Sequence, residues 1–120
     1  AGQPSSSWSP RDRHQPGDFG DTDIELLKAG MPKNVTLIAG IFPESATRLH
    51  DAICFAHVDM DLEKSTEDAI EWLEPRLVSG GIVVFDDWLW PQCPGVERAI
   101  RRAELAVVQS VPLLCFWRAQ

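Results

Sequence analysis

The sequence has no apolar stretch that approaches the roughly 20 residues a membrane-spanning helix needs, so no membrane segment is expected. Its first residues, AGQPSSS, are polar and do not resemble a secretory signal. Positive charge is also scarce, with 11 Lys and Arg against 18 Asp and Glu and a formal net charge of -7. A nucleic acid partner is not expected, because phosphate binding needs clustered Lys and Arg. These absences together favour a cytoplasmic protein.

Cysteine is sparse as well. Cys54, Cys93 and Cys115 are odd in number and show no metal-ligand spacing, so neither disulfides nor a zinc site is expected. Cys54 and Cys115 lie in apolar runs and are expected in the core. No G-x-G-x-x-G-like element precedes a helix, and Gly80-Gly81 precedes a strand. This pair predicts a turn with positive φ and not a phosphate-binding loop.

Composition divides the chain into two parts. Residues 1–22 are rich in Pro, Ser, Gly, Asp and Arg and lack periodicity, which predicts a loop or a disordered arm. Residues 23–120 alternate between strand-like and helix-like patterns, and their number suffices for one domain with a modest core. We expect them to form a single α/β domain.

The second part contains several predicted elements. Periodicity predicts helices at residues 23–29, 43–51 and 65–77 and one from Pro94, and apolar runs predict strands at 35–41, 53–59 and 82–85. Ser65 and Asp68 resemble a capping box for the third helix. Residues 105–117 are strand-like with a break near Pro112, which fits either a hairpin or one long bent strand. The alternation predicts a mostly parallel sheet with helices on both faces.

Two successive predicted strands end in acidic residues. Asp59 and Asp61 close the first run, and Asp86 and Asp87 close the second, with a helix between the two runs. The strands are therefore expected to be parallel neighbours, with both acidic pairs at the carboxyl edge where α/β sheets bind ligands. Neighbouring strands lie about 4.8 Å apart, so one Asp from each can reach a shared ion. Oxygen ligands favour Mg²⁺, Ca²⁺ or Mn²⁺ over zinc. A turn is expected at Asp87, where the strand pattern stops.

Other interpretations of these residues stay open. The acids also fit solvated loop residues or helix caps, and Asp61 fits the N-terminus of the following helix. His57, inside a predicted strand, is better explained as a core histidine than as a catalytic base. Trp88 and Trp90 stand beside the acids and fit either stacking on a substrate or covering the sheet edge equally well.

Several stretches, in this order and spacing, resemble the macrocin O-methyltransferase family. They are residues 56–66 (AHVDMDLEKST), 73–87 (LEPRLVSGGIVVFDD) and 90–96 (WPQCPGV), and residues 40–42 resemble the family's Gly-x-Phe. The resemblance covers roughly residues 18–105 and implies a truncated Rossmann-like methyltransferase sheet. It also implies a metal-dependent enzyme that uses S-adenosylmethionine to methylate a sugar or aromatic hydroxyl in a small-molecule acceptor.

The resemblance also implies roles for single residues. By position, Asp59, Asp86 and Asp87 match the family's magnesium ligands, and Asp59 matches the proposed general base. Glu63 departs from the family, which usually has Tyr there. The similarity is to the C-terminal half of the family only. The first strand, the glycine-rich turn and the ribose-binding acid of the donor site have no counterpart, so we expect weak or no binding of S-adenosylmethionine by this chain.

Two other functions fit the same residues. One is a non-catalytic, self-associating α/β module that binds a metal at the acidic edge. The other is a nucleotide-sugar glycosyltransferase, for which Asp59-x-Asp61 would be the metal-binding D-x-D motif, although no nucleotide pocket is evident. The family's strands that would hold residues 35–41 are not found in the sequence. We therefore expect this strand to pair beside residues 53–59, or two chains to form a homo-oligomer through the exposed sheet edge.

Overall fold

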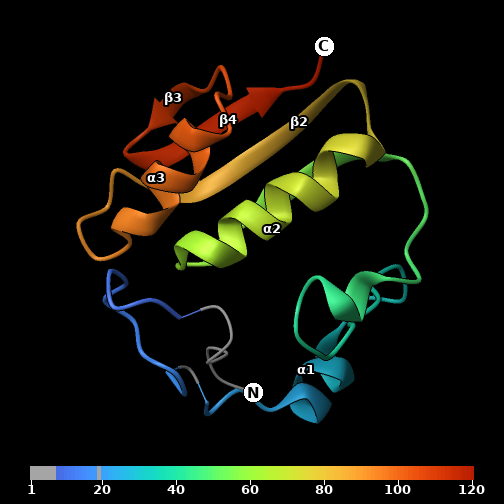
Figure 1. The fold of residues 1–120 in the computed structure, drawn as a ribbon. Helices are drawn as coiled ribbons and strands as arrows, with labels where there is room; N and C mark the ends of the chain where they lie inside the picture. Colours follow the sequence, from blue (N-terminus) through green and yellow to red (C-terminus); the bar gives the residue numbers. More distant parts are fainter. Residues whose placement is uncertain (1–7, 19) are drawn as a thin grey trace.

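The computed structural model describes residues 8–18 and 20–120 (Figure 1), so residues 1–7 and 19 of the predicted arm lie outside the described residues. The elements, with η marking 3-10 helices, are α1 (Ile24–Gly30), η2 (Glu44–Ala46), β1 (Ile53–Val58), α2 (Glu63–Leu73), η3 (Glu74–Arg76), β2 (Leu77–Trp88), α3 (Pro94–Arg102), β3 (Val108–Val111) and β4 (Leu113–Arg118). Among the described helices, none is long and apolar enough to cross a bilayer.

The four strands form one mixed sheet in the order β1-β2-β4-β3. β1 and β2 are parallel, whereas β2–β4 and β3–β4 are antiparallel. The prediction of a mostly parallel sheet is therefore wrong. The reason is the turn at Pro112, which makes β3 and β4 a hairpin and returns β4 against β2. A hairpin was one of the two structures that the sequence left open for this segment.

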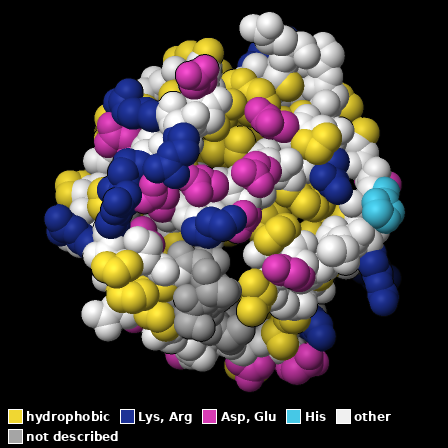
Figure 2. All heavy atoms as spheres, viewed as in Figure 1, with side chains coloured by type: hydrophobic (Ala, Val, Ile, Leu, Met, Phe, Trp, Pro, Cys, Tyr) yellow, Lys and Arg dark blue, Asp and Glu magenta, His cyan; other side chains and the backbone are white. Residues whose placement is uncertain are grey.

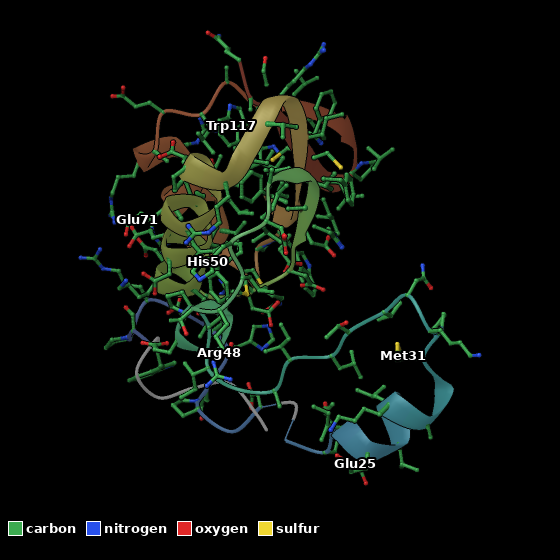
Figure 3. The ribbon with its side chains drawn as sticks, turned by 90° about the vertical axis from the view of Figure 1, so that its right-hand side faces the viewer. Glu25, Met31, Arg48, His50, Glu71 and Trp117 are labelled. Carbon is green, nitrogen blue, oxygen red and sulfur yellow. The ribbon has the colours of Figure 1, made fainter. Side chains whose placement is uncertain are left out.

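Helices cover one face of this sheet. α2 and α3 pack against each other in front of the strands in Figure 1. On β2, Val83 and Phe85 are fully buried beneath them, whereas Ile82 is 37% exposed. Phe55 pairs with Ile82 and is 61% exposed. α1 has no buried residue and stands apart from the sheet, as Figure 3 shows for its residue Glu25. The expectation of helices on both faces is wrong for the described helices.

The segment before β1 also differs from the prediction. Residues 35–41 form no strand, and Val35, Ile38 and Ile41 are 43%, 46% and 53% exposed. Residues 43–51 contain only the short η2 turn. Apolar, β-branched composition makes a segment suitable for a sheet, but a strand forms only where a partner backbone is in place. Among the described strands, β1 pairs with β2 alone, so the expected pairing of residues 35–41 beside it is wrong.

The predicted α2 is present but begins earlier than its predicted start. Its N-cap is Leu62, which makes no side-chain capping bond, so the predicted capping box at Ser65 and Asp68 is wrong. The cap comes from the N-terminal arm instead. The Asp12 carboxylate accepts hydrogen bonds from the backbone N–H of Glu63 (3.4 Å) and of Ser9 (3.0 Å), and Asp12 is buried. A carboxylate is favourable there because the first N–H groups of a helix have no partner within the helix.

Ion pairs join α2 to α3. Buried Glu63 accepts hydrogen bonds from Arg98 (2.8 Å) and Arg102 (3.1 Å), and Arg102 also contacts Glu67. Burial alone would raise the pKa of Glu63, but the hydrogen bond from Arg98 and the charges of both arginines lower it. Figure 2 shows basic and acidic side chains interleaved over the two helices. This network fixes the first turn of α2 against α3.

Gly95 gives a test of this packing. An added Cβ would lie 2.7 Å from the backbone N of Glu63 and 2.8 Å from Oδ1 of Asp12. We expect Gly95→Ala to lower the free energy of unfolding by about 1–3 kcal/mol in urea titrations, because α3 must move away from α2 and the arm. The matched control is Gly30→Ala, where the new Cβ meets no atom within 4 Å. Equal effects of the two variants would contradict this packing.

Candidate metal and catalytic site

Carboxylates from the ends of β1 and β2 converge at one edge of the sheet. Asp59 and Asp61 follow β1, and Asp87 lies near the end of β2. One oxygen of each lies within 4.8 Å of the others. The parallel register places Val58 beside Phe85, so the residues that follow these two start from adjacent positions. The arrangement suits a shared cation.

The backbone at these residues is unusual. Asp61 and Asp87 have φ of 59° and 60°, in the left-handed region that Asp adopts more readily than most residues. The β2–β4 register shifts between Phe85 and Trp88, which is a bulge that contains Asp87. Bulges re-aim side chains beside functional sites. The expectation that the strand stops and turns at Asp87 is wrong, because β2 continues through this bulge to Trp88 and the turn follows at Leu89.

Asp86 takes a different position from the other acids. Its Oδ1 accepts a hydrogen bond of 2.9 Å from the backbone N–H of Asp87. Burial is the largest cause of the raised pKa of both Asp59 and Asp87, and the charge of Asp86 raises it further. Asp61 stands in the convergent group instead, although the family resemblance did not place it among the ligands. The D-x-D spacing contained this signal, because it places Asp61 in the short loop that follows the same strand end as Asp59.

The acids disturb one another electrostatically. Burial, hydrogen bonding with Asp61 and the charges of Asp61 and Asp86 raise the pKa of Asp87 to about 7. Burial and the same two charges raise the pKa of Asp59, while His57 acts in the opposite direction. Like charges held this closely favour either a proton or a cation among them. The donor set therefore fits a hard divalent cation such as Mg²⁺ or Mn²⁺.

The residues around the acids differ in burial. His57 is exposed, so the expected core position is wrong, because β1 lies at the sheet edge with one face uncovered. Cys54 is also exposed, so its expected core position is wrong, whereas Cys115 is buried as expected. Trp88 is 7% exposed and packs in the core, whereas Trp90 is 37% exposed.

A cavity of about 450 Å³ opens beside Asp59. Its wall combines the edge of β1, one side of α2 and the segment around η2. The wall includes the aromatic side chains of Phe42, Phe55 and Trp72, and Phe42 packs edge-on against Trp72 with 5.5 Å between the ring centroids. No sequence pattern indicated this cavity, because its walls come from segments separated along the chain.

Buried Cys93 is a neighbour of the acids that the sequence analysis did not connect with them. It is the residue before α3, and its Sγ lies 3.8 Å from Oδ1 of Asp61. Burial and the charges of Asp87 and Asp61 raise the pKa of this thiol above its ordinary range. No sequence spacing indicated the contact, because the two residues lie 32 positions apart.

Comparison with known proteins relates this geometry to methyltransferases. The profile of a family described as a methyltransferase domain matches residues 6–88. Among solved structures, CalS11, described as a TDP-rhamnose 3'-O-methyltransferase of calicheamicin biosynthesis, is 29% identical with a TM-score of 0.50. The O-methyltransferase NovP is 26% identical with a TM-score of 0.54. No curated protein sequence matches the chain significantly.

These structural matches are partial. The CalS11 alignment covers 56% of this chain and 31% of that chain, and the NovP alignment covers 62% and 32%. The chain therefore spans about a third of the length of the structures that it matches.

The pKa of Asp87 predicts a dependence of stability on pH. In a chelator-treated sample, the folded protein holds a proton on Asp87 up to pH of about 7, whereas an unfolded aspartate with its ordinary pKa of 3.8 has lost it. The free energy of unfolding should therefore fall as pH rises from about 5 to about 8. Urea titrations across this range should show a flatter profile for Asp87→Asn. Asp51→Asn, at the opposite end of β1, should keep the original slope.

Proposed function

The chain belongs to the methyltransferase domain family, and from this premise we propose that its acidic edge is the metal- and acceptor-binding side of an O-methyltransferase. The convergence of Asp59, Asp61 and Asp87 is the observation that carries the proposal. The acceptor is a sugar or aromatic hydroxyl, and the description of CalS11 supports the sugar. Methyltransferase relatives imply S-adenosylmethionine as the donor.

The proposed cation is Mg²⁺, with Mn²⁺ as its closest substitute. Asp59 and Asp87 hold it, Asp61 adds a third carboxylate, and Asp86 contributes charge from beside the group. When bound, such a cation lowers the pKa of the acceptor hydroxyl. Asp59 is exposed and its pKa is raised, so it is the carboxylate suited to take the hydroxyl proton.

The cavity beside Asp59 suits the acceptor. A volume of about 450 Å³ accommodates a small molecule, and its aromatic side chains offer flat apolar surfaces to a sugar or aromatic ring. A hydroxyl on that ring can approach Asp59 from the cavity, because this residue belongs to the wall. The remaining wall would fix the ring and exclude water.

The described residues fit the methyl donor less well than they fit the metal and the acceptor. No glycine-rich turn links a strand to a helix among residues 8–18 and 20–120. Gly40 precedes the η2 turn, but Ser45 closes the space beside it, since an added Cβ would lie 2.8 Å from the Ser45 Cβ. The described residues therefore do not form the glycine-rich turn that would hold the donor.

Magnesium binding tests the proposal. We expect Mg²⁺ to raise the thermal unfolding temperature at pH 8, because the cation offsets the repulsion among the folded carboxylates. Asp59→Asn should weaken magnesium affinity at least about tenfold, measured by isothermal titration calorimetry. Asp51→Asn should bind Mg²⁺ as the unaltered chain does. Equal affinities for all three proteins, or no binding at all, would contradict the metal site.

A non-catalytic, self-associating metal-binding module is the second candidate. The observation that favours it is the free edge of β1, where Phe55 is 61% exposed. Two copies that pair through β1 would satisfy both edges with backbone hydrogen bonds. Magnesium binding without calorimetric binding of S-adenosylmethionine would support this module over an enzyme.

Self-association has its own test. Light scattering should show a concentration-dependent dimer, and Phe55→Lys should shift it toward monomer, because the two positive charges would meet across the paired edges. Leu26→Lys, at a 74% exposed position on α1, is the control and should dimerise as before. A chain that stays monomeric at every concentration would eliminate the proposed dimer.

A further inference from the structure

A second group of possible ligands lies next to the acidic group. His14, Asp61 and Cys93 each offer one atom within 4.8 Å of the others. We propose that these three side chains bind a divalent cation of the zinc class. This goes beyond the magnesium site, with which it shares only Asp61.

The chemistry of the three ligands differs from that of the acidic group. An imidazole nitrogen, a carboxylate oxygen and a thiolate sulfur are the ligands that Zn²⁺ takes in proteins, whereas Mg²⁺ prefers oxygen. Three protein ligands also leave a fourth position open, as in zinc sites that bind water or a substrate. The cysteine spacing along the sequence could not indicate this site, because His14, Asp61 and Cys93 are far apart in the chain.

The observed distances suit a tetrahedral ion. Bonds of about 2.0–2.3 Å to zinc place its ligand atoms about 3.3–3.8 Å apart. Sγ of Cys93 and Oδ1 of Asp61 are already 3.8 Å apart. The His14 nitrogen lies within 4.8 Å of both ligand atoms, so a shift of about 1 Å completes the set.

The carboxylate of Asp18 lies beside the imidazole ring of His14. Its Oδ2 lies 3.5 Å from Nδ1 of His14, and the other ring nitrogen, Nε2, is buried. Metal-binding histidines usually donate their second N–H to a carboxylate, which orients the ring and fixes the nitrogen that faces the metal. In this arrangement Nδ1 would face Asp18 and Nε2 would face the cation.

The fold holds His14 in place through Asp12. This residue is tied to the first turn of α2 by its bond from Glu63 N–H, and His14 follows two positions later. Figure 1 shows the arm approaching the start of α2 and the loop before α3. The anchored arm therefore delivers a nitrogen ligand to a place where the loop after β1 supplies oxygen and the loop before α3 supplies sulfur.

A bound cation would also relieve the charge around Cys93. This buried thiol lies among carboxylates that oppose its ionisation. Coordination by the metal stabilises the thiolate, and the thiol proton passes to solvent as the metal binds.

Cobalt titration of the full chain tests the site. Co²⁺ replaces Zn²⁺ and reports a sulfur ligand through a charge-transfer band in the near ultraviolet. We expect the band to saturate at one ion per chain, to disappear when Zn²⁺ is added, and to persist in excess Mg²⁺. Cys93→Ala should abolish it, whereas Cys54→Ala, which removes an exposed cysteine, should keep it.

The histidine side of the site gives an independent measurement. His14→Gln should weaken cobalt affinity at least about tenfold, and Asp18→Asn by about tenfold, with unchanged circular dichroism. A band that survives Cys93→Ala would overturn the proposal. An unchanged cobalt affinity in His14→Gln would also overturn it, and this second test does not require that Cys93→Ala folds. Asp59→Asn separates the two sites, because it should keep the cobalt band while magnesium stabilisation is lost.

Discussion

The parallel pairing of β1 with β2 is the constraint on which the candidate site depends. Val58 pairs with Phe85, and both side chains are buried under the helices. A slip of one residue would turn one of these side chains away from the core, so burial fixes the register. The register in turn sets Asp59 beside the acids of β2. The carboxylates therefore converge because the apolar residues just before them must be buried.

The helices α2 and α3 hold in place the two loops at this edge of the sheet. α2 links the two strands, and the ion pairs of Glu63 with Arg98 and Arg102 tie its first turn to α3. The loop after β1 ends where α2 begins, and the loop after β2 ends where α3 begins. Fixing the two helix starts against each other thus limits how far these loops can separate. The arm joins the same point through Asp12, which is why a segment without regular structure reaches the acids.

Local patterns predicted the parts of the fold that local forces determine. Such features are the acidic strand ends, the apolar stripe of α2, Pro94 in the first turn of α3 and the hairpin as one of two options. Each could be predicted because it is set by neighbouring residues. The strand at 35–41 failed because pairing needs a partner that composition does not reveal. The capping box failed because Asp12, 51 positions before Glu63, supplies the carboxylate. Cys93 and His14 were missed for the same reason, since tertiary contacts alone bring them to Asp61.

The position of Asp61 between two ligand sets has an electrostatic consequence. It belongs to one group with Asp59 and Asp87 and to another with His14 and Cys93. A carboxylate has two oxygens, so a single residue can serve a hard cation and a softer one. A cation in either set reduces the negative charge that the other set feels, which weakens the attraction for a second ion. Since the sets differ in ligand chemistry, the available metal would decide which one fills first. The convergence that makes the edge attractive to cations therefore also couples its two candidate sites.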